Sequence, residues 1–162
     1  MKEPLLEIKD ERLSFFTPAG EVKALNGVSF SMEEGEVLGI VGESGSGKSV
    51  TAYSIMGLTA YPGKLIGGTI RFNGHQIDKM TEKEFRHLRG NEVSIIFQDP
   101  MTSLNPVYTI GNQIVEVILL HTDKTRAEAK ARAKELLELV GINEPEKRLK
   151  QYPHELSGGL RQ

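Results

Sequence analysis

The sequence predicts an α/β fold in which a strand-rich first part, to about residue 100, precedes a helical second part. The apolar run VLGIV (residues 37–41) has no polar face, as expected of a central parallel strand covered by helices. It leads directly into the glycine-rich stretch GESGSGKSV (residues 42–50). From residue 109 onward, apolar residues instead recur at helical spacing.

The composition is that of an ordinary globular protein. The chain has 162 residues, of which 38% are hydrophobic and 26% charged, which is enough for one domain with a core. The net charge of -2 gives no basic excess and argues against nucleic acid as the main partner. Because there is no cysteine, the chain has no disulfide, cysteine-ligated metal or thiol catalysis. The most apolar window, IVEVILL, is shorter than the roughly 20 residues of a membrane span.

The first part begins with patterns typical of an antiparallel sheet. LLEIKDERLSFF (residues 5–16) predicts a strand, a turn and a second strand. VKALNGVSFSM (residues 22–32) continues as a strand, with apolar and polar residues alternating toward its end. GTIRFNGHQI (residues 68–77) predicts a hairpin that turns near Asn73 and Gly74.

Helices and one further strand are expected around this sheet. The stretch KSVTAYSIMGL (residues 48–58) predicts a helix after the glycine-rich stretch. A second helix is expected over residues 81–90, where Thr81 and Glu84 form a capping-box pattern and Gly90 ends the helix. VSIIFQ (residues 93–98) predicts a second buried strand.

The second part predicts two helices, over residues 109–120 and 125–140, with Gly141 ending the second. One face of the second helix is apolar and should pack against its neighbour. The residues of this face are Ala129, Ala133, Leu136, Leu137 and Val140.

The glycine-rich stretch predicts a phosphate-binding loop, because Gly42, Gly47, Lys48 and Ser49 satisfy the pattern G-x-x-x-x-G-K-[ST]. Glycines let backbone N–H groups converge on phosphate oxygens, and the N-terminus of the following helix favours anions. Lys48 would neutralise the β- and γ-phosphates, and the Ser49 hydroxyl would ligate Mg²⁺. One alternative is a flexible glycine turn, but such a turn does not need a buried strand before it and a helix after it. The other is a dinucleotide-binding site, but the fingerprint of those sites lacks the Lys-Ser ending.

Two further stretches narrow the kind of nucleotide-binding protein. The chain contains LSGGLRQ (residues 156–162), and Gln98 stands at the end of a predicted strand, where ligands of open α/β sheets bind. In these features the sequence resembles the ATP-binding-cassette (ABC) ATPases, which have an LSGGQ-like signature and a Q-loop glutamine after a strand. GIVGESGSGKSVTAYSIMGL, IFQDPMTSLNPVYTIGNQI and YPHELSGGLRQ resemble the peptide and nickel importers of the dipeptide and oligopeptide permease type.

The resemblance covers essentially the whole chain and implies a P-loop NTPase fold. It implies an incomplete ABC nucleotide-binding domain over residues 1–162. Within it, an antiparallel β subdomain and the phosphate-loop core would occupy residues 1–100. A helical subdomain would occupy residues 101–162, up to the signature.

The resemblance also implies a role for each matching residue. Lys48 and Gln98 would be catalytic, with Gln98 contacting the attacking water, and Ser49 and Gln98 would hold Mg²⁺. The stretch from Ser157 to Gly159 would bind the γ-phosphate held by an opposite subunit, although a plain helix N-cap is the alternative. An aromatic side chain, Phe15 or else Phe16, would stack on adenine unless both are core residues. The residues expected to bind ATP are Phe15, Gly42, Glu43, Ser44, Gly45, Ser46, Gly47, Lys48, Ser49, Val50, Ser157, Gly158 and Gly159.

The function that the resemblance implies is that of an ATP-binding subunit of an importer for peptides, with nickel and oligosaccharides as open alternatives. Its partners would be integral membrane permease subunits, a second ABC ATPase subunit and, indirectly, an extracytoplasmic solute-binding protein. It would lie at the cytoplasmic face of the cell membrane. Soluble ABC proteins of DNA repair or translation share these motifs but need a basic surface for nucleic acid, which the net charge of -2 argues against.

Two catalytic elements of the resembling family are absent from residues 1–162: an apolar strand ending in Asp-Glu, and a later switch histidine. We therefore expect a fragment of a larger ATPase, which binds nucleotide with negligible hydrolysis when alone. A non-hydrolysing binding protein is the open alternative. Without the missing strand, the apolar surface of residues 37–41 and 93–97 should stay uncovered, which favours aggregation.

Overall fold

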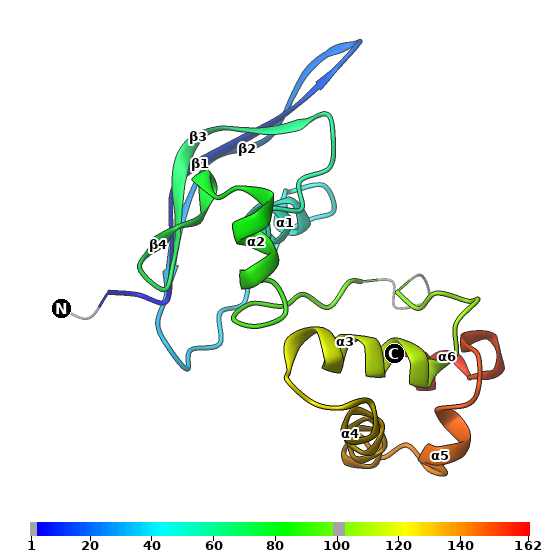
Figure 1. The fold of residues 1–162 in the computed structure, drawn as a ribbon. Helices are drawn as coiled ribbons and strands as arrows, with labels where there is room; N and C mark the ends of the chain where they lie inside the picture. The colour runs from blue at the N-terminus through cyan, green and yellow to red at the C-terminus, as the bar shows by residue number, and fades with distance from the viewer. Residues whose placement is uncertain (1–2, 99–102) are drawn as a thin grey trace. The chain divides into compact units, whose positions relative to one another are not determined.

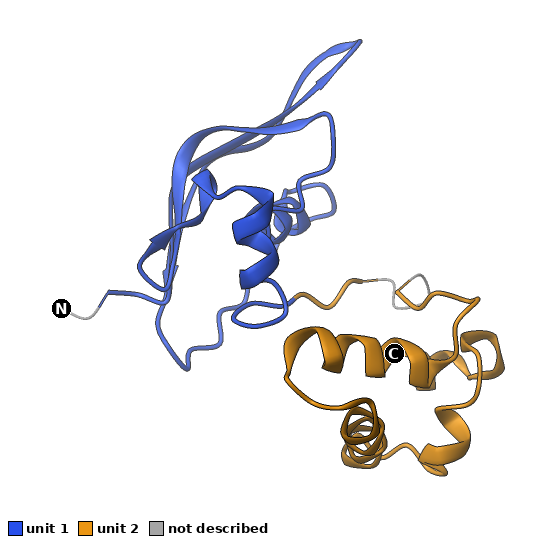
Figure 2. Ribbon diagram, viewed as in Figure 1, with its two compact units in different colours: residues 1–94 blue, residues 95–162 orange. Residues whose placement is uncertain are grey.

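The computed structural model describes residues 3–98 and 103–162 (Figure 1). The chain divides into two compact units, residues 1–94 and residues 95–162 (Figure 2). The first unit contains the sheet and the second contains the longer helices.

The first unit is built on a four-stranded antiparallel sheet with the strand order β2-β1-β3-β4. Its strands are β1 (Leu6–Thr17), β2 (Gly20–Met32), β3 (Gly63–Phe72) and β4 (His75–Gln76). The hairpin predicted at Asn73 and Gly74 is confirmed, since both residues have the positive φ angles (48° and 78°) of a tight turn between β3 and β4.

The turn predicted inside residues 5–16 is wrong, because β1 is one strand with an irregularity at Asp10. The pairing with β2 shifts register between Ile8 and Glu11, and Asp10 has a φ of 48°. The Asp10 N–H donates to the Ser29 hydroxyl at 2.8 Å, and its carboxylate pairs with Arg12 at 2.9 Å. Because β1 pairs with β2 on one side and β3 on the other, the strand resumes after this bulge.

Helices cover one face of the sheet and close its core. The helices are α1 (Lys48–Ile55), the 3-10 helix η1 (Ile77–Lys79) and α2 (Glu82–Leu88). The capping box predicted for α2 is present, with the Thr81 N–H donating to the Glu84 carboxylate at 2.6 Å. Residues of β1, β3, η1 and α2 form one apolar cluster: Leu6, Ile8, Ile70, Phe72, Ile77, Phe85 and Leu88.

The two predicted buried strands are not strands in this structure, which corrects the sequence analysis. Residues 37–41 and 94–97 have no regular secondary structure, and Val93 makes only an isolated bridge to Arg89. Val37 is 96% exposed and Ile96 is 94% exposed. No strand among the described residues pairs with either segment, so backbone and side chains lack the neighbours that a central parallel strand requires. The expectation that their apolar surface stays uncovered is confirmed in part: Val37, Val41 and Ile96 are more than 90% exposed, whereas Val93 packs against the apolar cluster of the first unit.

The second unit is helical, with α3 (Ile110–His121), α4 (Arg126–Leu139), α5 (Pro145–Arg148), the 3-10 helix η3 (Pro153–Glu155) and α6 (Gly158–Arg161). Val115 and Ile118 of α3 pack against Ala129 and Ala133 of α4, so the predicted apolar face of α4 is largely confirmed. Val140 was expected on that face, but it is 71% exposed because α4 ends at Leu139. In the described part of the chain, no helix has the length and apolarity needed to cross a membrane.

Candidate nucleotide-binding site

The loop of residues 42–49 leads into α1, and glycine is required where the two meet. Gly47 caps α1 with a φ of 93°. A Cβ atom on Gly47 would lie 2.6 Å from the Leu25 side chain and 3.0 Å from the Ala24 carbonyl oxygen of β2. A larger residue would therefore be strained in its backbone and would collide with the sheet. The end of the loop is held directly against β2.

The Lys48 side chain turns back into its own loop. Its ammonium group donates to the carbonyl oxygens of Gly42 and Glu43, at 2.7 and 2.6 Å, and reaches the Ser46 hydroxyl at 3.3 Å. A Cβ atom on Gly42 would lie 2.7 Å from that same hydroxyl oxygen. The structure thus brings together Gly42, Glu43, Ser46 and Lys48, four of the residues predicted to form the site.

The N-terminus of α1 has hydrogen-bond donors with no partner. No side chain caps the helix, and within the described residues the N–H groups of Lys48, Ser49 and Val50 donate to no protein acceptor. Unpaired N–H groups and the helix dipole give this end a partial positive charge, to which the Lys48 ammonium adds a full one. Ser49 is exposed, and its own N–H belongs to this donor set. The arrangement fits the phosphate groups of a nucleotide.

The helix that presents these donors is fixed at both ends. At its start, the Thr51 N–H and hydroxyl donate to the Gly47 carbonyl at 2.9 and 3.1 Å. At its end, the Arg89 guanidinium donates to the carbonyl oxygens of Met56 and Gly57 at 2.8 and 2.9 Å. Arg89 was not singled out in the sequence, because a residue that caps a helix 33 positions earlier leaves no local signal.

Beneath α1 lies a buried polar group that the sequence analysis also missed. Glu11 of β1 is fully buried, and neither of its carboxylate oxygens has a hydrogen-bond partner among the described residues. Burial raises the pKa of Glu11. The nearby Ser54 hydroxyl offsets part of that rise, although it donates its hydrogen bond to the Thr51 carbonyl, at 2.7 Å, rather than to the carboxylate. Nothing in the alternation of β1 marks Glu11 as buried, because the bulge at Asp10 shifts the pattern.

The two aromatic candidates for stacking on adenine are consecutive residues of β1, so their side chains point to opposite faces of the sheet. Phe15 pairs with Val22 of β2, which is two residues, or about 7 Å, from the Ala24 carbonyl that borders Gly47. Phe16 is 45% exposed, and the Lys64 ammonium lies 5.9 Å from its ring centre. The Phe15 ring lies against Gly63 of β3, where an added Cβ atom would be 2.8 Å from it, and its role in stacking stays a prediction.

The remaining predicted residues belong to the second unit, which is described by itself. Gln98 is exposed and lies in an irregular segment rather than at the end of a strand. Ser157 is the N-cap residue of α6, but its side chain makes no capping hydrogen bond. A Cβ atom on Gly158 or Gly159 would meet no atom within 4 Å, so this surface is open. The roles of Gln98 and of residues 157–159 remain predictions.

Comparison with known proteins identifies close relatives. The chain is 55% identical, over 159 residues, to the oligopeptide transport ATP-binding protein OppD of Bacillus subtilis. It is 51% identical to OppD of Escherichia coli and 48% identical to the dipeptide transport ATP-binding protein DppD of the same species. These matches cover 98–99% of the chain, whereas the chain spans only 44–48% of the length of these relatives.

The fold also matches a solved structure. The dimeric structure of MJ0796, a bacterial ABC transporter cassette, superposes with a TM-score of 0.82 over 96% of this chain and 65% of that one. At 23% identity this likeness establishes the fold alone. A family model for ABC transporters matches residues 25–162, which include the loop, Gln98 and the LSGG stretch. The chain therefore belongs to the ABC transporter family.

Proposed function

We propose that the protein containing this chain is the ATP-binding subunit of an ABC importer for peptides. The observation that carries the proposal is the unsatisfied donor set at the start of α1, beside Lys48 and Ser49. The named relatives at about 50% identity are transport ATP-binding proteins for oligopeptides and dipeptides, which favours peptides over nickel or oligosaccharides as the solute.

The loop would hold the nucleotide by its phosphates. The N–H groups of Lys48, Ser49 and Val50 would donate to phosphate oxygens, and the Lys48 ammonium would exchange its bonds to loop carbonyls for bonds to the β- and γ-phosphates. The Ser49 hydroxyl and Gln98 would hold Mg²⁺, which supplies positive charge against the phosphates. Phe15 would stack on the adenine ring.

A second copy or a related subunit would complete the site. Ser157, Gly158 and Gly159 leave an exposed hydroxyl and open backbone at the start of α6, suited to the γ-phosphate held by the opposite subunit. The structure of MJ0796 is described as dimeric, in agreement with this arrangement. Because the chain spans 44–48% of its relatives, we assign hydrolysis to the whole protein rather than to residues 1–162.

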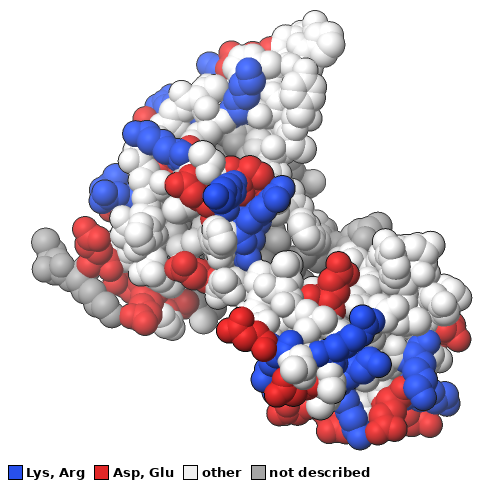
Figure 3. All heavy atoms as spheres, in the orientation of Figure 1, with Lys and Arg blue, Asp and Glu red and all other residues white. Residues whose placement is uncertain are grey.

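The further partners would be integral membrane permease subunits and, through them, an extracytoplasmic solute-binding protein. The protein would then lie at the cytoplasmic face of the membrane. Acidic and basic side chains are intermixed on the visible face of each unit, without a continuous basic surface there (Figure 3). This pattern, together with a net charge of -2, does not favour nucleic acid as a partner.

The proposal is tested by uptake in cells of the source organism. Replacing Lys48→Ala in the native protein should abolish the uptake of labelled di- and oligopeptides, because the loop then lacks its phosphate-binding cation. Uptake of Ni²⁺ and of oligosaccharides should be unchanged. The matched control is Lys64→Ala, which removes a lysine near Phe16 without touching the loop. Unchanged peptide uptake in the Lys48→Ala cells would overturn the proposal, and a selective loss of Ni²⁺ or oligosaccharide uptake would replace the solute.

A further inference from the structure

The second unit contains a pocket that the nucleotide site does not use. It has a volume of about 590 Å³ and lies where α3, α4 and the end of α5 meet. Val115, Ala131 and Leu149 contribute apolar surface to its wall. The pocket is large enough for a small organic molecule and has both apolar and charged walls.

The charge of this pocket is strongly one-sided. Its lining includes four cationic side chains and a single acidic one, Glu146. Arg126, Lys130 and Lys134 stand four residues apart along α4 and so share one face of the helix. Glu146 pairs with Lys134 at 2.6 Å and is also attracted by the charge of Lys150, so one carboxylate faces four cations. Within the described residues, Arg126, Lys130 and Lys150 have no ion pair.

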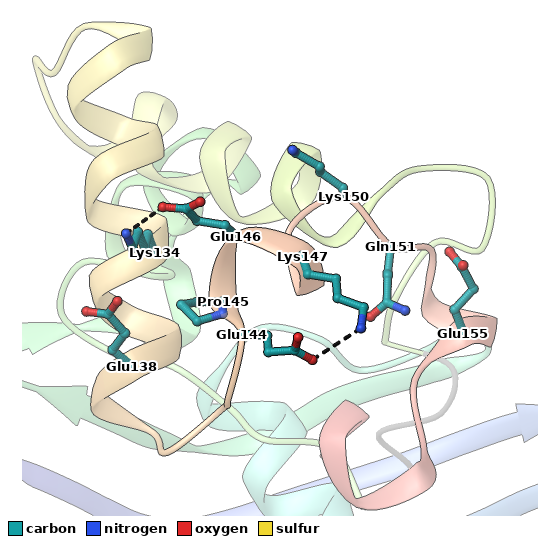
Figure 4. A pocket seen from close by; sticks show the side chains of 9 residues that line it. All are labelled: Lys134, Glu138, Glu144, Pro145, Glu146, Lys147, Lys150, Gln151 and Glu155. Carbon is teal, nitrogen blue, oxygen red and sulfur yellow. Dashed lines mark hydrogen bonds and ion pairs between the residues drawn. The ribbon is translucent and has the colours of Figure 1, made fainter.

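A neighbouring pocket shows the contrast. It has a volume of about 730 Å³ and shares Lys134, Glu146 and Lys150 with the first (Figure 4). There four glutamates outnumber three lysines, and a second ion pair joins Lys147 to Glu144 at 3.2 Å within α5 and its N-cap. In Figure 4 the Lys150 side chain extends away from that pair. The acidic groups on this side leave no cationic excess for an anion.

The row of cations Arg126, Lys130 and Lys134 destabilises α4 unless a counter-charge is present, because like charges four residues apart repel each other on a helix. The neutral hydrogen-bond donors near the pocket are of two kinds. The backbone N–H groups of Ile110 and Gly111 are not available, because they already donate to the carbonyls of Gln151 and Leu149, at 2.9 and 2.8 Å. The Asn112 side-chain amide lines the pocket and makes no hydrogen bond within the described residues. The donors that remain available are therefore side chains, namely the cationic groups and the Asn112 amide.

We propose that this pocket binds a small organic anion that carries at least two negative charges and a short apolar part, such as a phosphate monoester or a polycarboxylate. Arg126, Lys130 and Lys150 bind the charged groups, Asn112 donates to an oxygen, and Val115 and Leu149 contact the apolar part. This site is separate from the loop at residues 42–49, because all of its residues belong to the second unit.

The test is a titration of the isotope-labelled protein, followed through its backbone amide NMR signals. Phenyl phosphate and citrate represent the two ligand sources, and inorganic phosphate reports the effect of charge alone. We expect saturable shifts of the Gly111, Asn112, Ala131 and Lys150 signals, with tighter binding of one organic probe than of inorganic phosphate. Signals of Gly45 and Gly47 report any binding to the loop in the same spectra, so failure here and failure of nucleotide binding are distinguishable.

The variant Arg126→Gln with Lys130→Gln keeps good helix formers and removes two cations, and it should weaken binding at least about tenfold. The matched control is Arg132→Gln on the same helix, which pairs with Glu135 at 2.7 Å and does not line the pocket. It should bind like the unaltered protein. Non-saturating shifts, equal binding by the double variant, or a tenfold loss in the control would each overturn the proposal. The relative affinities of phenyl phosphate and citrate identify the ligand source.

Discussion

Lys48 shows how a single side chain can hold a binding loop in shape before any ligand arrives. Its ammonium group bonds two carbonyl oxygens of the loop, at Gly42 and Glu43, so the loop is curled around the cation. Phosphate oxygens are stronger acceptors for an ammonium group than neutral carbonyls, because charge assists the hydrogen bond. The proposed nucleotide binding would therefore need only a local exchange of the acceptors of Lys48.

Glu11 should make stability depend on pH. Its pKa is raised by burial from the ordinary value of 4.5. Above about that pH the unfolded chain releases a proton that the folded state still holds, so the contribution of Glu11 to stability is greatest in acid and falls as pH rises. We expect Glu11→Gln to increase the free energy of unfolding at pH 7.5 by about 1–3 kcal/mol, and to change it little at pH 4.5.

The measurement is urea denaturation at the two pH values. Glu21→Gln is the control, because Glu21 is exposed on β2 and should show no such pH dependence. An equal effect of Glu11→Gln at both pH values would contradict the assignment of a raised pKa to Glu11.

A comparison of alanine substitutions at Gly45 and Gly47 separates the cost of backbone strain from the cost of a steric clash. Both have positive φ angles, of 81° and 93°, but a Cβ atom on Gly45 would meet no atom within 4 Å. We expect Gly45→Ala to lower the free energy of unfolding by about 1 kcal/mol, the cost of the left-handed backbone alone. Gly47→Ala should cost clearly more, because its methyl group collides with Leu25. Thermal or urea unfolding of the two variants measures the difference, and equal losses would show that the contact with β2 does not matter.

At the scale of elements, local signals in the sequence predicted structure well and non-local ones did not. The helices α2 and α4 carry their own boundaries, since Thr81 with Glu84 and Thr125 with Glu128 form the capping boxes. The turn at Asn73 and Gly74 is likewise local. The bulge at Asp10 could not be foreseen, because the pairing of β1 with strands on both sides decides that the chain continues rather than turns.

The same distinction holds for the candidate site. The loop could be predicted because its residues are contiguous and its chemistry depends on the backbone. Gln98 was predicted at the end of a strand. That strand is not formed, because a parallel strand is stable only when neighbouring strands pair with it. Arg89 and Glu11 act on α1 from distant positions in the sequence, so no motif could reveal them.

The uncovered segments at residues 37–41 and 93–97 should make the chain associate with itself. Each segment exposes apolar side chains outside the described helices and the sheet, with Val37 and Ile96 almost fully exposed, and such apolar surface promotes association. We expect Val37→Ser with Ile96→Ser to reduce the weight-average mass measured by light scattering at matched concentration. Leu139→Ser is the control, because Leu139 is also exposed, at 69%, but lies in a helix whose backbone is paired. An equal reduction by Leu139→Ser would show that the segments are not special.

At the scale of the whole molecule, the two units carry different parts of one proposed function. The first unit contains the loop, α1 and Phe15, and the second contains Gln98 and the LSGG stretch. The family match runs across both units, over residues 25–162, and the peptide-transport relatives are about twice as long as the chain. We therefore assign the proposed catalytic cycle to the whole protein, and we expect the first unit to bind phosphate by itself.

The most direct test of phosphate recognition is the affinity of the protein for ATP, ADP and AMP in the presence of Mg²⁺, measured by isothermal titration. If the donors of α1 and Lys48 bind the β- and γ-phosphates, ATP and ADP should bind at least about 100-fold more tightly than AMP, because AMP lacks both groups. Equal affinity for AMP and ATP would show that the base or sugar is recognised instead, and would contradict the assignment of the loop.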